Sequence, residues 1–235
     1  MSPSGLAAAT SDLARSLQSV HGNVEATLQT ITRRVLAGVH GTEHAGITLV
    51  TGAGRLESRA ATGPLPEKLD ALQGEVGEGP CLQALWEQQT VRVDDMASEE
   101  RWPRFTARAL DAGVGSMLCF QLFVRGRNLG ALNLYASRPG AFGQDGEVVG
   151  LVFATHAAVA LSAAQEIEHL RTAVDSHTLI GQATGILVER HRLTPEVAFA
   201  RLSRASQDTN VRLLEIARRV VTTGSVPGDA STEAL

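Results

Sequence analysis

Apolar residues recur at intervals of three and four in three successive stretches between His177 and Gly224. Each stretch predicts a short amphipathic helix with one apolar face, and such short helices are not stable alone. We therefore expect the three to pack together as a small bundle. The apolar positions are, in order, Leu179, Ala183, Ile186 and Leu187; Phe199, Leu202 and Ala205; and Leu213, Ala217, Val220 and Val221.

The ends of these helices are also marked in the sequence. Thr194, Pro195 and Glu196 supply an N-cap hydroxyl, a proline at the first helical position and an acid in the first turn. Asn210 can cap the following helix, and Gly224 lies where that helix would end.

The N-terminal two thirds of the chain mixes helical and strand patterns. A loose tail to about residue 10 precedes helical spacing from Asp12 to Val39, where Gly22 and Asn23 favour two helices or one bent helix. Two short strands, two antiparallel arms around a turn at Arg125–Asn128, and several helices follow. The predicted strands are 46–50, 56–62, 91–95 and the hairpin 115–137; the predicted helices are 64–73, the second half of 74–89, and 101–112. The pattern indicates an α+β body with an antiparallel sheet.

Residues 145 to about 177 form one long helical stretch that is mostly apolar and rich in alanine. A heptad of Phe153, Ala160, Ile167 and Val174, with His156, Ala163, Leu170 and His177 three residues later, is compatible with a two-stranded coiled coil. The alternative is a long helix that packs on its own sheet. A pH switch at the two histidines is a weaker interpretation than ordinary packing.

The 235-residue chain is 43% hydrophobic and shows no apolar run that approaches the roughly 18 residues of a membrane span. The N-terminus lacks a basic region before its apolar residues, which argues against a signal peptide. Two cysteines, Cys81 and Cys119, make no disulfide framework. We expect a cytoplasmic protein without membrane association.

Charge is distributed unevenly. From Leu170 to Gly224 the chain has eight arginines and five acids, whereas the whole chain carries a net charge of −4. A basic C-terminal module on an acidic body suggests a polyanionic partner, although a solvated arginine-rich surface explains the excess almost as well.

The sequence offers little evidence for catalysis. The histidines and cysteines have no zinc-binding spacing, so we expect no metal site, no catalytic residues and no bound cofactor. A small-molecule pocket in the body is one interpretation of a set of large or polar residues, and the other is that they simply fill the core. These candidates are Cys81, Trp86, Asp95, Trp102, Phe105 and Cys119.

The segment IGQATGILVERHRLTPEVAFARLSRASQDTNVRLLEIARRVV closely resembles the ANTAR domain, an RNA-binding module of bacterial transcription antitermination regulators. Thr184 departs from the pattern, because many relatives have lysine there. Residues from about 20 to 160 resemble a GAF domain through the segment GEGPCLQALWEQQ, the following VDD and the late hairpin ending in NLY. The expected organisation is residues 1–19 as tail and start of a helix, 20–160 as GAF sensory domain, 161–225 as a three-helix ANTAR bundle and 226–235 as flexible tail.

This resemblance to actinobacterial GAF-ANTAR regulators implies a homodimer that binds two stem-loops in nascent mRNA and prevents a terminator from forming. Phosphate contacts from arginine and polar side chains that reach unpaired bases suit such a target. Gly181 and Gly185, one turn apart, are costly in a helix and make sense where a neighbouring helix or RNA approaches closely. Our candidates for the RNA face are Gln182, Thr184, Gly185, Arg190, Arg204, Ser206, Asn210 and Arg212, of which Ser206 and Asn210 could instead be internal caps.

Two other functions remain open at this point. Three short basic helices also describe a helix-turn-helix protein that binds DNA, although Pro195, Glu196 and Val197 are poor base readers for the start of a recognition helix. Some GAF-like domains reduce methionine sulfoxide through cysteines, and Cys81 and Cys119 would have to supply that pair.

Overall fold

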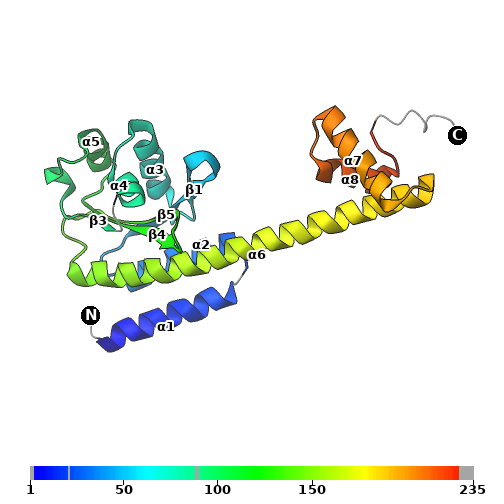
Figure 1. Cartoon of the computed structure of the whole chain (residues 1–235). Helices are drawn as coiled ribbons and strands as arrows, with labels where there is room; N and C mark the ends of the chain where they lie inside the picture. The colour runs from blue at the N-terminus through cyan, green and yellow to red at the C-terminus, as the bar shows by residue number, and fades with distance from the viewer. Residues whose placement is uncertain (1–2, 21, 88–89, 228–235) are drawn as a thin grey trace. The chain divides into compact units, whose positions relative to one another are not determined.

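The computed structural model describes residues 3–20, 22–87 and 90–227. The chain divides into two compact units, residues 1–167 and residues 168–235. The expected α+β class is confirmed: an antiparallel sheet flanked by helices, a long helix and C-terminal helices follow one another along the chain (Figure 1).

The N-terminal unit is built on a five-stranded sheet. Its strands lie in the order β2-β1-β5-β4-β3, and neighbouring strands are antiparallel. Arg125 and Gly126 join β4 to β5, both with positive φ, as a two-residue type I′ turn requires. The expected hairpin is therefore confirmed. The strand bounds are β1 His44–Thr51, β2 Arg55–Arg59, β3 Thr90–Val93, β4 Ser116–Val124 and β5 Arg127–Ala136.

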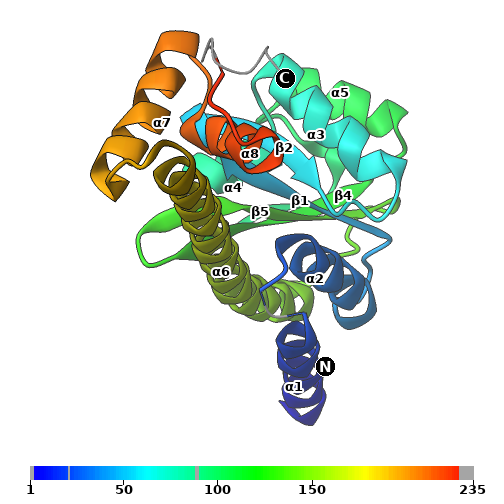
Figure 2. The same ribbon diagram turned by 90° about the vertical axis from the view of Figure 1, so that its right-hand side faces the viewer.

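Alternation along the strands separates two apolar cores. On one face Leu118 and Phe120 pack with α1 (Pro3–Ser19), α2 (Val24–Gly38) and the first half of α6 (Gln144–His191). On the other face Met117, Cys119 and Tyr135 pack with α3 (Pro64–Val76), α4 (Pro80–Trp86) and α5 (Pro103–Asp111). Figures 1 and 2 show these two helical layers on opposite sides of the sheet.

The N-terminal helical region is two helices, α1 Pro3–Ser19 and α2 Val24–Gly38. Between them Gly22 has a φ of 79°, and the side chain of Asn23 caps α2 by accepting from the amide of Ala26 at 2.8 Å. The expected loose tail to residue 10 is wrong, because α1 begins at Pro3. Residues 1 and 2 lie outside the described residues.

Three short helices cover the second face, and each begins with a proline, whose missing amide hydrogen is not needed there. They are α3 Pro64–Val76, α4 Pro80–Trp86 and α5 Pro103–Asp111, with 3₁₀ turns at Gly52–Gly54 and Met96–Ser98. Residues 88 and 89 of the expected 74–89 segment lie outside the described residues.

Helix α6 runs from Gln144 to His191, and the division between the two units falls within it. The first of the three expected C-terminal helices is therefore not a separate element, since Gly181 and Gly185 do not end the helix. Phe153 is only 2% exposed and packs on the sheet, so the expected coiled-coil seam is wrong at that position. The alternative, packing on its own sheet, holds for the first half of α6.

By length and composition alone α6 could also cross a membrane, although no unbroken apolar run is apparent in the sequence. The core helix of a soluble protein can have the same length and composition. Val149, Phe153, Ala157 and Leu161 of α6 are buried in the first core, as in such a helix.

The C-terminal unit contains the end of α6, α7 Pro195–Thr209 and α8 Leu213–Thr223. Its core consists of Ala183, Leu187, Ala198, Leu202, Ala205, Ile216, Ala217, Val220 and Val226. Two expectations fail here. Phe199 is 46% exposed instead of buried, and Val226, expected in a flexible tail, is only 5% exposed in this core. The rest of that tail, from residue 228, lies outside the described residues.

Candidate functional site

The turn between α7 and α8 is fixed by side chains that were expected to face RNA. Asn210 adopts a left-handed conformation with a φ of 52° and ends α7, so its expected role as N-cap of α8 is wrong. Arg212 occupies that N-cap position instead. The hydroxyl of Ser206 donates to the carbonyl oxygen of Val211 at 2.6 Å. Ser206 is therefore an internal cap, whereas the side-chain amide of Asn210 remains at the surface.

Helix α7 begins as its sequence indicates. Thr194 is the N-cap, and its hydroxyl oxygen accepts from the amide of Val197 at 3.4 Å. Pro195 is the first helical residue, and Glu196 lies in the first turn, where hydrogen bonds to its own amide and to Thr194 lower the pKa of its carboxyl group. An acid at this position favours helix formation but repels a phosphate.

The arginines expected at the RNA face differ in what they contact. Arg190 donates from Nη1 to the carbonyl oxygen of Gly224 at 2.7 Å and so fastens α6 to the end of α8. The side chain of Arg204 is 84% exposed and makes only a loose pair with Asp208 at 3.8 Å. Arg212 is exposed at the start of α8. Arg204 and Arg212 are thus available to a phosphate, whereas Arg190 donates a hydrogen bond within the bundle.

The remaining candidates lie on α6. Gln182 and Gly185 are exposed, while Thr184 is half-buried and its hydroxyl donates to the carbonyl oxygen of Ile180 at 2.8 Å. A Cβ atom at Gly181 or Gly185 would meet nothing within 4 Å, so packing within the chain does not require either glycine. Gln182 also lines a surface groove between α6 and α8, together with Thr172, Asp175, Ser176, Thr178, Leu179, Leu214 and Arg218.

The second core of the N-terminal unit contains a buried polar cluster. Asn133 of β5 is 0% exposed, and its amide nitrogen lies 2.9 Å from the hydroxyl oxygen of Thr48, 3.2 Å from the sulfur of Cys81 and 3.3 Å from a carboxylate oxygen of Asp70. The hydroxyl of Tyr135 donates to the same oxygen of Asp70 at 3.3 Å. Side chains from β1, β5, α3 and α4 therefore converge between the sheet and its helices.

This cluster leaves two buried acceptors without a partner. Among the described residues, Oδ1 of Asn133 and Oδ2 of Asp70 are buried and accept no hydrogen bond. Burial raises the pKa of Asp70, and hydrogen bonds from Ser58, Thr48, Tyr135 and Asn133 oppose this rise in part. A buried acceptor without a partner is costly, so the cluster suits a small hydrogen-bond donor.

Cys81 lies at the start of α4, where its amide donates to the side chain of Gln73 at 2.8 Å. The thiol is 2% exposed and donates to Thr48 at 3.4 Å. Burial, with a contribution from the charge of Asp70, raises the pKa of Cys81 to about 12. Burial likewise raises the pKa of Cys119 well above its ordinary value. Neither cysteine is a ready nucleophile.

Four of the six pocket candidates lie in one core: Cys81, Trp102, Phe105 and Cys119 share the second core. Trp86 is 57% exposed and lines a surface hollow together with Trp102 and Arg101. Asp95 caps the 3₁₀ turn by accepting from Ala97 at 3.0 Å.

Sequence reasoning did not place Thr48, Asp70, Asn133 and Tyr135 in a site. A signal was present for three of them, because Asn133 and Tyr135 belong to the NLY motif and Thr48 stands between two apolar residues of its strand. The sequence around Asp70 gave no signal of a buried site, because an acid on a helix ordinarily faces solvent. No group of three or more histidine, cysteine or acidic side chains among the described residues could hold a metal ion.

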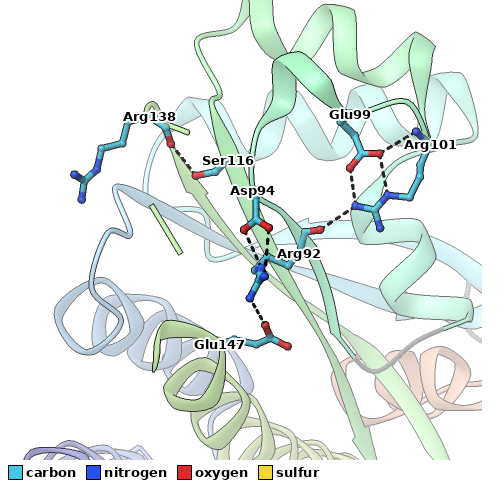
Figure 3. A network of polar contacts seen from close by, with 7 residues as sticks. All are labelled: Arg92, Asp94, Glu99, Arg101, Ser116, Arg138 and Glu147. Atoms are coloured by element: carbon cyan, nitrogen blue, oxygen red, sulfur yellow. Dashed lines mark hydrogen bonds and ion pairs between the residues drawn. The ribbon is translucent and has the colours of Figure 1, made fainter. Parts of the chain in front are cut away.

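A polar network ties the edge of the sheet to the start of α6 (Figure 3). Arg92 of β3 donates to Glu147 of α6 at 2.8 Å and pairs with Asp94 at 2.8 Å. Arg101, itself paired with Glu99 at 2.6 Å, donates to the carbonyl oxygen of Arg92 at 2.9 Å. The strand that borders the second core is thereby bonded directly to the long helix.

Two family models match the chain. A model described as a GAF domain matches residues 21–162, more than half of the chain, and a model described as an ANTAR domain matches residues 168–221. These matches confirm the two resemblances found in the sequence. No curated protein matches the chain.

Solved structures resemble the fold at low sequence identity. The GAF domain of a phosphoenolpyruvate-protein phosphotransferase from Acinetobacter is 15% identical with a TM-score of 0.56, over 72% of this chain and 99% of that one. Free methionine-R-sulfoxide reductase from Neisseria meningitidis is 18% identical with a TM-score of 0.56, over 71% and 95%. A domain of a sensor histidine kinase protein from Sinorhizobium meliloti 1021 is 23% identical with a TM-score of 0.50, over 63% and 93%.

Proposed function

The chain belongs to the GAF domain family and carries an ANTAR domain after it, and from this premise we propose that it is a sensory regulator that acts on nascent mRNA. Its ANTAR domain binds a pair of stem-loops and promotes transcription antitermination. Its GAF domain controls this activity in response to a signal of unknown identity. The protein works in the cytoplasm as a homodimer.

One observation carries the proposal. The ANTAR match coincides with a folded bundle on which Gln182, Gly185, Arg204, Asn210 and Arg212 are exposed. Arginine at a surface supplies the phosphate contacts, and an exposed amide can reach the edge of an unpaired base. The three candidates with internal bonds, Thr184, Arg190 and Ser206, support this surface from within.

RNA is favoured over duplex DNA by the start of α7. A DNA recognition helix reads the major groove with its N-terminal residues. In α7 these are Pro195, Glu196 and Val197, which offer no base-reading donor and one negative charge.

Dimerisation is supported by the exposed apolar residues of α6. Leu170 is 61% exposed and Val174 63%, and both belong to the expected seam. Because Phe153 is buried in its own unit, we place pairing in the later part of α6. His177 of the same seam is exposed.

The signal acts at the polar cluster of Thr48, Asp70, Cys81, Asn133 and Tyr135. A bound molecule that donates hydrogen bonds to its two unpartnered acceptors would change the packing of α3 and α4 on the sheet. No cofactor is expected there.

An enzyme of the reductase type is disfavoured. A thiol–disulfide step needs a thiolate that can reach its substrate. Burial raises the pKa of Cys81 to about 12, and the thiol is nearly inaccessible.

The test is a titration of the full chain with fluorescent RNA that contains two adjacent hairpins with randomised loops, beside a duplex DNA of equal length. We expect tighter binding to the RNA, with an affinity that falls as salt rises because phosphate contacts release counterions. Equal or tighter binding to duplex DNA would favour the transcription-factor alternative. Selected RNAs placed upstream of a terminator should then raise read-through in single-round transcription, and no rise would contradict antitermination.

A further inference from the structure

Phe199 is an aromatic side chain at the surface of the C-terminal unit. It lies in the second turn of α7 and is 46% exposed. The core side of α7 is filled by its neighbours Ala198, Leu202 and Ala205. The bundle therefore packs without the outer part of this ring, in a chain with only 4% aromatic residues.

The ring is not part of a broad apolar surface. Val197, the other exposed apolar residue of α7, lies two positions earlier and points roughly 160° away around the helix. Glu196 and Ser203, which flank Phe199 at one helical turn, are polar. A docking site for a protein needs a larger contiguous apolar area than one ring provides.

The same flank of α7 carries polar groups further along the helix. Ser203, Ser206 and Asn210 follow Phe199 at four, seven and eleven residues, which places them on one side. The side-chain amide of Asn210 is exposed and has no hydrogen-bond partner among the described residues. The ring and the amide are separated by roughly 16 Å along the helix axis, the distance of several nucleotides.

We propose that Phe199 is a stacking platform for an unpaired base of the RNA. This inference rests on the proposed function and names the part of the RNA that this surface takes, a base exposed in a single-stranded loop. Every base has a π-face, and an exposed aromatic ring is a common way to hold one. The eight arginines against five acids between Leu170 and Gly224 supply the attraction for the backbone.

The test compares Phe199→Leu, Phe199→Trp and Val197→Ala in the full chain. The probe is the tightest hairpin pair selected from the randomised loops, and a fully paired duplex RNA of equal length serves as the RNA control.

Phe199→Leu should weaken binding to the hairpins roughly tenfold, as the loss of one stacked base does. The slope of affinity against salt should stay the same, because no charge is removed. Phe199→Trp should retain affinity, and its added fluorescence should be quenched by the RNA. Val197→Ala should bind as the wild type does.

Three results would overturn the inference. Phe199→Leu could bind the hairpins as tightly as the wild type. It could lower the thermal stability of α7 and α8, in which case the ring has a structural role. It could also convert a dimer to a monomer in sedimentation, in which case the ring contacts a second copy. If the wild-type chain binds none of the RNAs, the proposed function itself fails, a result that is distinct from the loss of affinity in one variant.

Discussion

Arg190 and Gly224, 34 residues apart, are joined by a hydrogen bond of 2.7 Å from the guanidinium Nη1 to the carbonyl oxygen. Gly224 ends α8 in the left-handed conformation, with a φ of 76°. A cation is favourable at this end of a helix, where carbonyl groups have no intrahelical partner. The pair thus closes the bundle between its first and last helices.

Replacing Arg190 by alanine should therefore destabilise the bundle by roughly 1 kcal/mol, the usual net value of such a bond. The matched variant Arg204→Ala should leave stability unchanged, because that side chain is 84% exposed and its ion pair is loose. RNA affinity should fall in both. Hydrogen–deuterium exchange of the α8 peptides in the full chain measures the first effect. Equal protection of α8 in Arg190→Ala and Arg204→Ala would contradict it.

Much of the fold was readable from local patterns. The two apolar arms of β4 and β5 and the turn between them predict the hairpin, and prolines mark the starts of α3 and α7. The continuity of α6 was not readable, because the apolar spacing from His177 was interpreted as a short helix of its own, whereas α6 continues from Gln144 to His191. Asparagine is suited both to an N-cap and to a left-handed C-cap. The sequence around Asn210 does not show which of the two positions it occupies.

The functional site was readable in part for similar reasons. Exposed residues such as Arg204 and Arg212 follow from a motif and from charge. Phe199 was assigned to the core because it has the right spacing, and spacing does not show that the small Ala198 takes the inner position. The cluster around Asn133 depends on contacts over more than 80 residues of sequence, such as the one with Thr48, and no local pattern encodes those.

Gly181 and Gly185 should behave differently from Gly150, although all three lie in α6. Alanine at Gly181 or Gly185 meets open space and should stabilise the helix by roughly 1 kcal/mol each. RNA affinity should nevertheless fall, since the open face of these glycines lets a partner approach the helix closely. Thermal unfolding by circular dichroism and RNA titration measure the two effects.

Gly150→Ala is the control, because its Cβ would overlap the ring of Phe120 and should destabilise the N-terminal unit by about 1–3 kcal/mol. If Gly181→Ala and Gly185→Ala bind RNA as the wild type does, the glycines do not lie at the interface.

Cys81 should be inert in the folded protein. Burial raises the pKa of its thiol to about 12, so almost no thiolate exists near pH 8, and the side chain is 2% exposed. Iodoacetamide should label neither Cys81 nor Cys119 under native conditions and both in denaturant, as mass spectrometry would show. Cys81→Ser should keep RNA binding. Native labelling of Cys81 at the rate of a free thiol would support a reactive role instead.

Asp70 should make the N-terminal unit less stable as pH rises. Burial raises the pKa of Asp70 above its unfolded value, so between the two values the folded state binds more protons than the unfolded state. The free energy of unfolding therefore falls as pH increases through this window and is greatest below it. Asp70→Asn cannot ionise, so the variant removes this contribution. Urea unfolding of the full chain at a series of pH values from about 4 to about 8 should show a flatter profile of unfolding free energy against pH for Asp70→Asn than for the wild type.

The exposed substitution Asp111→Asn should leave the wild-type profile in place. A profile for Asp70→Asn as steep as that of the wild type would mean that the Asp70 carboxyl group is already charged in the folded state across this range.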